Sequence, residues 1–236
     1  MMCIDKSSGN KRILIVVAHP DDEVLGIGGT IAKYALAGHK VYCLFLGEGV
    51  TSRYRERVEA EEKEIGVLRR QAEKAATILG TTRGIFKTFP DNRFDSVPLL
   101  EIVKTVEEVK EEIEPDIVYT HHQGDLNVDH QITSKAVATA FRYMEGERVN
   151  RTYFFETPSS TECSLPNSQN FFLPNTFVDI SETLENKIEA LRAYQSEIRK
   201  YPHPRSPEAL RAIAMRWGSV VGREYAEAFE LVRAIE

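Results

Sequence analysis

The sequence predicts an α/β protein with a Rossmann-like, doubly wound and mostly parallel sheet flanked by helices. Short, continuous apolar runs rich in β-branched residues, such as residues 13–18 and 41–46, are typical of strands buried on both faces. Residues 22–37 lie between these runs and carry apolar side chains at helical spacing. A strict alternation of strands and helices indicates parallel strands with helices on both faces of the sheet.

The alternation continues through the first 145 residues. Gly38 ends the first predicted helix and Pro115 stops the third. The predicted elements are a strand at 13–18, a helix at 22–37, a strand at 41–46, a helix at 56–79, a strand at 84–89, a helix at 99–113 and a strand at 117–120.

The remaining residues, 146–236, differ in composition and complete the same domain. The elements predicted there are a long loop at 157–170, a late strand at 176–180, a helix from the cap Ser181 to Ala193, and two further helices at about 207–215 and 223–235. We therefore expect a single domain over 1–236, with an α/β core at 1–145 and a C-terminal helical elaboration.

Composition excludes several classes of protein. Thirty basic and 36 acidic residues give a net charge of −6, which argues against a general nucleic-acid binder. No run approaches the ~20 apolar residues that span a bilayer, so we expect a cytoplasmic protein without a membrane span. The three cysteines are widely spaced and form no CxxC pair, which argues against a disulfide framework or a thiolate zinc site.

Two polar clusters follow predicted strands whose carboxyl ends meet at one edge of the sheet, where ligands bind in open α/β folds. They are residues 19–23 (His-Pro-Asp-Asp-Glu) and residues 121–130. Adjacent aspartates repel one another, and a divalent cation would supply the counter-charge; imidazole and carboxylate are suitable zinc ligands. His19 and Asp22 would share one side of a helix N-terminus, with His130 as third ligand, which leaves Asp21 free to act on a water.

Two other interpretations of the first cluster stay open at this point. Asp and Glu in the first turn of a helix are stabilised by the helix dipole and need no metal. Gly26-Ile27-Gly28-Gly29 faintly resembles a dinucleotide fingerprint, but its glycines fall inside the predicted helix rather than in the strand-to-helix turn. Close packing of the helix explains these glycines better, and the second polar cluster favours the metal.

Residues 18–23 (Ala-His-Pro-Asp-Asp-Glu), followed by Gly28-Gly29-Thr30, resemble the opening of the LmbE-like (PIG-L) family of zinc-dependent N-deacetylases. The resemblance extends to residues 49–53, to Asp129-His130 and to residues 187–194, and so covers most of the chain. The hexapeptide is quite specific for the family, whereas the other segments support it by their order and position.

The resemblance implies one zinc ion as cofactor and a role for each matching residue. His19, Asp22 and His130 would be the metal ligands, and Asp21 the general base. Arg53 would contact the substrate. We place Asp129 in the same pocket, where it would contact substrate, orient His130 or cap the following helix.

One position departs from the family pattern. Many members have a histidine three residues before the last metal ligand, where it helps to stabilise the developing oxyanion, and this chain has Asn127. The amide of Asn127 could polarise the carbonyl, or His121 or His122 could reach in. We therefore count Asn127 and His122 with Asp21 as catalytic candidates.

The expected activity is hydrolytic removal of an acetyl group from an N-acetylated amino sugar or glycoconjugate, a small molecule. An amidase of a thiol–sugar conjugate would use the same site. A non-catalytic metal- or sugar-binding module is the alternative from another class, although such a module has no need of the base Asp21. The sequence leaves a homo-oligomer, and the use of other divalent transition metals, open.

Overall fold

A seven-stranded mixed sheet, in the order β3-β2-β1-β4-β5-β7-β6, forms the centre of the protein. The computed structural model describes residues 10–53, 62–167 and 170–235, without the side chains of Arg53, Glu62 and Lys63. The strands are β1 (Arg12–Val17), β2 (Lys40–Gly47), β3 (Arg83–Phe89), β4 (Ile117–His121), β5 (Arg151–Phe155), β6 (Thr176–Asp179) and β7 (Ala226–Ala234).

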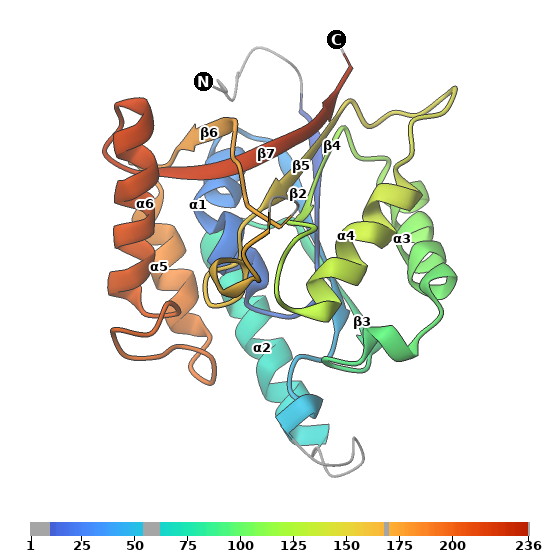
Figure 1. The fold of residues 1–236 in the computed structure, drawn as a ribbon, viewed down its shortest axis with the longest axis horizontal. Helices are drawn as coiled ribbons and strands as arrows, with labels where there is room; N and C mark the ends of the chain where they lie inside the picture. Colours follow the sequence, from blue (N-terminus) through green and yellow to red (C-terminus); the bar gives the residue numbers. More distant parts are fainter. Residues whose placement is uncertain (1–9, 54–61, 168–169, 236) are drawn as a thin grey trace.

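Helices cover both faces of this sheet (Figure 1). They are α1 (Asp22–Leu36), α2 (Glu62–Leu79), α3 (Leu99–Ile113), α4 (Val128–Ala140), α5 (Leu184–Ala193) and α6 (Pro207–Val221), with short 3-10 helices η1 (Thr51–Arg53), η3 (Phe94–Ser96) and η4 (Thr161–Cys163). The α2 helix agrees with the prediction from Glu62 onward, and residues 54–61 of that prediction lie outside the described residues.

Strands β1 to β5 run parallel, which confirms the predicted Rossmann-like, mostly parallel sheet. From the central β1 the chain adds β2 and β3 on one side, then crosses to add β4 and β5 on the other. The order therefore reverses between β1 and β4. Ligands of doubly wound sheets bind outside the carboxyl ends of the strands at such a point.

Alternate side chains of the central strands pack into two hydrophobic cores, one on each face of the sheet. Ile13, Ile15 and Val17 of β1 pack with α1, α2 and α5, whereas Leu14 and Val16 pack with α3 and α4. Figure 1 shows the corresponding arrangement, with α3 and α4 on one side of the sheet and α1, α2, α5 and α6 on the other. The continuous apolar run of β1 is thus explained by burial on both faces.

The chain end differs from the prediction, which placed a helix at 223–235. Residues 226–234 form β7, which pairs antiparallel with both β5 and β6. Alanine and glutamate favour a helix locally, but pairing with a strand on each side overrides that preference. Strand β5 was also absent from the predicted elements, so the second part of the chain contributes more of the sheet than its sequence pattern indicates.

The glycines of α1 serve close packing, as expected from their place inside the predicted helix. A Cβ built on Gly26 would lie 2.3 Å from the Phe155 ring of β5, and one on Gly29 would lie 2.8 Å from Ile180. Only glycine lets α1 approach these neighbours. None of the helices in the described residues is long and apolar enough to cross a membrane.

Candidate metal centre and active site

Three side chains from the two predicted polar clusters meet at the carboxyl ends of β1 and β4. His19 follows β1, Asp22 begins α1, and His130 lies in the first turn of α4. Asp22 Oδ2 lies 3.6 Å from His19 Nδ1 and 3.4 Å from His130 Nε2. The three residues are buried, and each offers a ligand atom within 4.8 Å of the other two.

This donor set fits zinc. Bonds of about 2.0–2.1 Å in a tetrahedral arrangement place neighbouring ligand atoms about 3.3–3.5 Å apart, close to the separations here. The negative charge around His130 also favours its protonated form. Burial opposes protonation of His130, but Asp22 and Asp125 outweigh burial and raise the pKa of His130 to about 9. The site therefore attracts a cation, and a metal ion can replace these protons.

Asp129 fixes His19 from behind. His19 Nε2 lies 2.9 Å from Asp129 Oδ2 and 3.1 Å from Asp91 Oδ1, so the opposite nitrogen, Nδ1, faces Asp22. Asp129 is fully buried and also accepts hydrogen bonds from the backbone N–H groups of Asn92 and Phe94. Carboxylates in this position orient metal-binding histidines. The structure thus places Asp129 behind the histidine rather than on a surface open to substrate.

Asp125 occupies the equivalent position behind His130. Its Oδ1 lies 3.1 Å from His130 Nδ1, without the alignment of a hydrogen bond. The carboxylate is held by the hydroxyls of Ser160 and Thr161 and by the backbone N–H of Asn127. Burial opposes ionisation of Asp125, but His130 and these donors lower its pKa to about 2. Asp91 and Asp125 were not among the predicted site residues, although they follow the carboxyl ends of β3 and β4, where polar residues are informative.

Asp21 stands apart from the three candidate ligands. Its backbone has a φ of 112° and a ψ of −27°, a conformation that costs an aspartate about 1–3 kcal/mol and marks functional sites. The Asp21 N–H donates to Glu23 Oε2 at 3.1 Å, and Tyr194 holds that carboxyl by donating to Oε1 at 2.7 Å. The Asp21 side chain makes no capping hydrogen bond to α1, so a helix cap does not explain it.

The environment of Asp21 gives its carboxyl an unusual proton affinity. Burial raises the pKa of Asp21 to about 7, against the opposing charges of Arg205 and His19. Arg205 contributes the nearest of these charges: its Nη1 lies 2.9 Å from Asp21 Oδ2. Sequence reasoning missed Arg205, which lies 184 residues from Asp21 and carries no motif.

The other predicted residues lie around this group. His121 Nε2 lies 3.5 Å from Asp22 Oδ2, and the His121 ring stacks on that of His130 with centroids 3.9 Å apart. His121 Nε2 accepts the Ala18 N–H at 2.9 Å, and burial lowers the pKa of His121 to about 3, so its ring is neutral. His122 contacts Glu230 at 2.7 Å and the Asn170 carbonyl at 3.0 Å.

Asn127 and Arg53 complete the predicted set. The Asn127 side chain caps α4 by accepting the Asp129 N–H at 2.8 Å, and its amide donates to Asn92 Oδ1. Arg53 ends η1, and its side chain lies outside the described residues.

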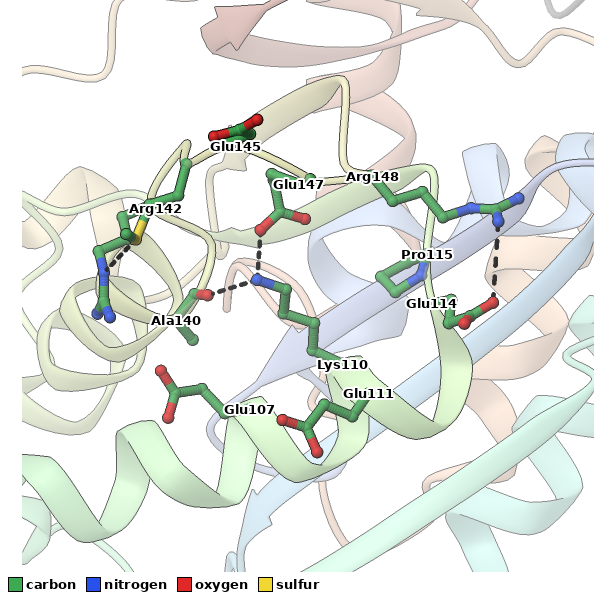
Figure 2. A pocket seen from close by; sticks show the side chains of 12 residues that line it. Glu107, Lys110, Glu111, Glu114, Pro115, Ala140, Arg142, Glu145, Glu147 and Arg148 are labelled. Carbon is green, nitrogen blue, oxygen red and sulfur yellow. Dashed lines mark hydrogen bonds and ion pairs between the residues drawn. The ribbon is translucent and has the colours of Figure 1, made fainter.

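A separate pocket lies near the amino ends of β4 and β5, away from the His19 group, between α3 and the segment after α4 (Figure 2). Lys110 points into it and binds the Ala140 carbonyl and the Glu147 carboxylate. Arg148 lies 3.8 Å from Glu114 at the other end. These charges are paired with one another, and none belongs to the His19 group.

A family model described as "PIG-L: GlcNAc-PI de-N-acetylase" matches residues 14–141, more than half of the 236-residue chain. The chain belongs to the PIG-L family. The resemblance carried by the hexapeptide at 18–23 is thereby confirmed, and that hexapeptide supplies two of the three candidate ligands.

Relatives in this family include deacetylases. The chain is 28% identical over 231 residues to diacetylchitobiose deacetylase of Thermococcus kodakarensis, covering 95% of this chain and 84% of that protein. It is 25% identical over 193 residues to probable N-acetyl-alpha-D-glucosaminyl L-malate deacetylase 2 of Bacillus anthracis, covering 79% and 81%. Among solved structures, GalB, the 4-carboxy-2-hydroxymuconate hydratase of Pseudomonas putida KT2440, matches with a TM-score of 0.69 at 25% identity, covering 96% and 98%.

Proposed function

We propose that this protein is a zinc-dependent hydrolase that removes the acetyl group from an N-acetylated amino sugar or its glycoconjugate. One observation carries the proposal: three residues converge as a metal donor set, and a strained, buried carboxylate, Asp21, stands beside it without joining it. A metal site used only for stability has no need of such a group. Because relatives of the chain are deacetylases, we take the amide bond of an acetamide group as the bond to be cleaved.

His19, Asp22 and His130 would hold the metal, with Asp129 and Asp125 orienting the two histidines. When bound, zinc polarises an amide carbonyl and lowers the pKa of water from about 15.7 to about 7. Because Asp21 is buried beside the donor set, its carboxylate is placed to take a proton from water at the same point. A base with a pKa of about 7 suits proton transfer near neutral pH.

The proton then follows a closed route through Asp21. As the base takes the proton, the water oxygen bonds to the carbonyl carbon, and the carbonyl oxygen gains the negative charge. The protonated Asp21 next passes its proton to the departing nitrogen, the C–N bond breaks, and acetate and a free amine result. A raised pKa favours this second step, because a carboxylic acid must persist long enough to act as an acid.

Three rivals differ in their products. An amidase of a thiol–sugar conjugate would release an amine from a larger acyl group. A hydratase, as GalB is named, would add water to a C=C bond and release no amine. A binding module would bind zinc and sugar without turnover, and the strained base argues against it.

Zinc-loaded and chelated protein should be compared on N-acetylglucosamine and N,N′-diacetylchitobiose, with free amine and acetate measured together. We expect equal amounts of both products, loss of turnover on chelation and recovery on adding zinc. The same preparations should be offered 4-carboxy-2-hydroxymuconate and an acylated thiol–sugar. Sugar binding by the zinc form without amine release would support the binding module, and consumption of the unsaturated acid alone would support a hydratase.

A further inference from the structure

The negative charge that develops on the carbonyl oxygen needs a stabilising group besides the metal, and the histidine of the family pattern is replaced by Asn127 in this chain. We propose that Arg205 is this group: a catalytic residue whose guanidinium stabilises the oxyanion of the tetrahedral intermediate. The inference rests on the proposed deacetylase function.

The oxyanion donors predicted from the sequence, Asn127, His121 and His122, already make other contacts. The side-chain oxygen of Asn127 accepts a hydrogen bond from the N–H of Asp129, and its amide donates to Asn92. His121 uses Nε2 as an acceptor for the Ala18 N–H, so that nitrogen presents no proton to an anion. His122 directs its two nitrogens to Glu230 and to the Asn170 carbonyl. None of the three offers a donor to the space beside Asp21.

Arg205 does reach that space. Its Nη1 lies 2.9 Å from Asp21 Oδ2 and 3.4 Å from Glu197 Oε2, and its Nε donates to Ser159 Oγ at 2.9 Å. Three contacts from separate parts of the chain fix the plane of the guanidinium. Within the part of the chain that the structure describes, no hydrogen bond takes up Nη2, so two N–H donors of this fork remain available.

The charge of Arg205 acts on the whole site. Asp21 raises the pKa of Arg205 against the effect of burial, and Asp22, Glu197 and Asp91 add to it, so the guanidinium stays charged throughout. Asp22 is a candidate metal ligand, and Asp91 contacts His19. Because Asp21 directly precedes the candidate ligand Asp22, the contact between Nη1 and Asp21 places the cation beside the centre where the amide must react, and 29% of its side chain is exposed.

The contact with Asp21 explains why this arginine would favour the transition state over the ground state. Before reaction, Asp21 carries the negative charge and holds Nη1. When Asp21 takes the water proton it becomes neutral, while the carbonyl oxygen becomes negative. Negative charge thus passes from Asp21 to the carbonyl oxygen. The guanidinium loses its ion pair with Asp21 and gains one with the oxyanion. Interactions that strengthen only at this stage accelerate the chemical step.

The test compares binding of a tetrahedral anion with binding of the planar amide. The anion is glucosamine carrying a methylphosphonamide in place of the acetamide, and the reference ligand is N-acetylglucosamine, each titrated into zinc-loaded protein. We expect Arg205→Met to weaken binding of the phosphonamide by about 10²–10³-fold and to lower kcat by a similar factor. Affinity for N-acetylglucosamine, KM and zinc content should change by less than about threefold, and Arg205→Lys should recover part of the loss.

Arg199 provides the matched control. It lies in the same loop, is exposed, and directs its guanidinium to the backbone carbonyls of Ser196 and Ile198. Arg199→Met removes the same charge from the same segment, and both ligands should bind it as they bind wild type. An equal loss of phosphonamide binding in Arg199→Met and Arg205→Met would overturn the proposal.

A double-mutant cycle separates stabilisation of the oxyanion from simple positioning of Asp21. In an Asp21→Asn background, Arg205→Met should still weaken phosphonamide binding, because the anion contacts the guanidinium directly. No further effect in that background would show that Arg205 acts only through Asp21. If Arg205→Met fails to fold or to hold zinc, Arg205→Lys and rescue of Arg205→Ala by guanidinium ion, with sodium chloride as control, decide the question by the same ligand ratio.

The outcomes also separate this inference from the function on which it rests. Wild type that binds the phosphonamide tightly, with unchanged binding by Arg205→Met, overturns the role of Arg205 and leaves the deacetylase intact. Wild type that shows no preference for the phosphonamide over N-acetylglucosamine overturns both.

Discussion

His19 Nε2 lies 2.9 Å from Asp129 Oδ2, and that carboxylate is fully buried behind the ring. The pair fixes which nitrogen of His19 faces Asp22. It also accounts for Asp129 without any substrate contact, because its oxygens are already shared with His19 and with two backbone N–H groups. The Asp-His pair at 129–130 therefore contributes to the donor set in two ways. Asp129 orients His19, and His130 is itself a candidate ligand.

Asp129→Asn should weaken zinc binding rather than sugar binding. Losing a carboxylate behind a metal-binding histidine costs about 10–100-fold in metal affinity, so we expect the zinc Kd to rise by that factor. At saturating zinc, KM should stay near the wild-type value. Competition with a chromophoric chelator gives the Kd, and the exposed Asp95→Asn serves as the control. A raised KM with unchanged zinc affinity would instead place Asp129 on the substrate.

His130 and His121, which both lie near Asp22, should differ in their effect on metal content. His130→Ala removes a candidate ligand, and we expect it to lose zinc and all turnover. His121→Gln keeps an acceptor for the Ala18 N–H, so it should retain zinc. It loses the buried contact between His121 Nδ1 and Thr157 Oγ1, which should cost about 1–3 kcal/mol of stability. Metal analysis after dialysis and thermal unfolding measure the two effects. Zinc lost from His121→Gln at an unchanged Tm would mean that the donor set is wrong.

Asp21 should control the acid side of the pH–rate profile. Burial raises its pKa to about 7, and the base acts only when deprotonated, so kcat/KM should rise with pH and level off above the pKa. A bound cation favours the charged carboxylate, which moves the rise to lower pH, never higher. Asp21→Asn should bind zinc normally and lower kcat by about 10²–10⁴-fold. Turnover at the wild-type rate in that variant would remove Asp21 from the mechanism.

Sequence reasoning succeeded where the signal is local. The strand at 13–18, the cluster that follows it and the cluster after β4 were each visible in a few neighbouring residues. The rule that parallel strands end at one edge then brought His19 and His130 together without a structure. The same kind of signal was available for β5, because the aromatic run Tyr153-Phe154-Phe155 favours a strand.

The residues that sequence reasoning missed depend on contacts between distant segments. Residues 226–234 are rich in alanine and glutamate and favour a helix, and only pairing with β5 and β6 makes them a strand. Arg205 reaches Asp21 across 184 positions, from a loop with no periodicity. Even Asn127, which stands at the position of a family histidine, could not be recognised as a cap until the N–H of Asp129 was seen to point at it.

His122 should matter for stability and not for turnover. Burial opposes its protonation, but Glu230 outweighs burial and raises the pKa of His122. A raised pKa in the folded state stabilises the protein fully below the unfolded pKa of about 6.5, and the effect is lost as pH rises through the folded pKa. The deficit of His122→Gln in unfolding free energy should therefore be largest near pH 6, at most about 3 kcal/mol, and shrink at higher pH.

Denaturant unfolding at several pH values measures this deficit, and Glu230→Gln should show the same pH trend because it removes the other half of the pair. Turnover by His122→Gln should stay within about twofold of wild type, since both ring nitrogens of His122 contact Glu230 and the Asn170 carbonyl rather than the donor set. A loss of turnover by about 100-fold at unchanged stability would instead make His122 a catalytic residue.

Asn127 offers the sharpest separation between a cap and an oxyanion donor. Its Oδ1 accepts the Asp129 N–H at 2.8 Å as the cap of α4, while its Nδ2 donates to Asn92 at 3.0 Å. Serine is an equally good cap but has no amide to donate, whereas alanine has neither and costs about 0.5–2 kcal/mol of stability. We expect Asn127→Ser to match wild type in Tm, Asn127→Ala to unfold earlier, and both to keep kcat within about threefold, because loss of an oxyanion donor would cost about 10²–10³-fold. A loss of about 100-fold in turnover by Asn127→Ser at wild-type Tm would make the Asn127 amide the oxyanion donor and reduce Arg205 to a residue that holds Asp21 in place.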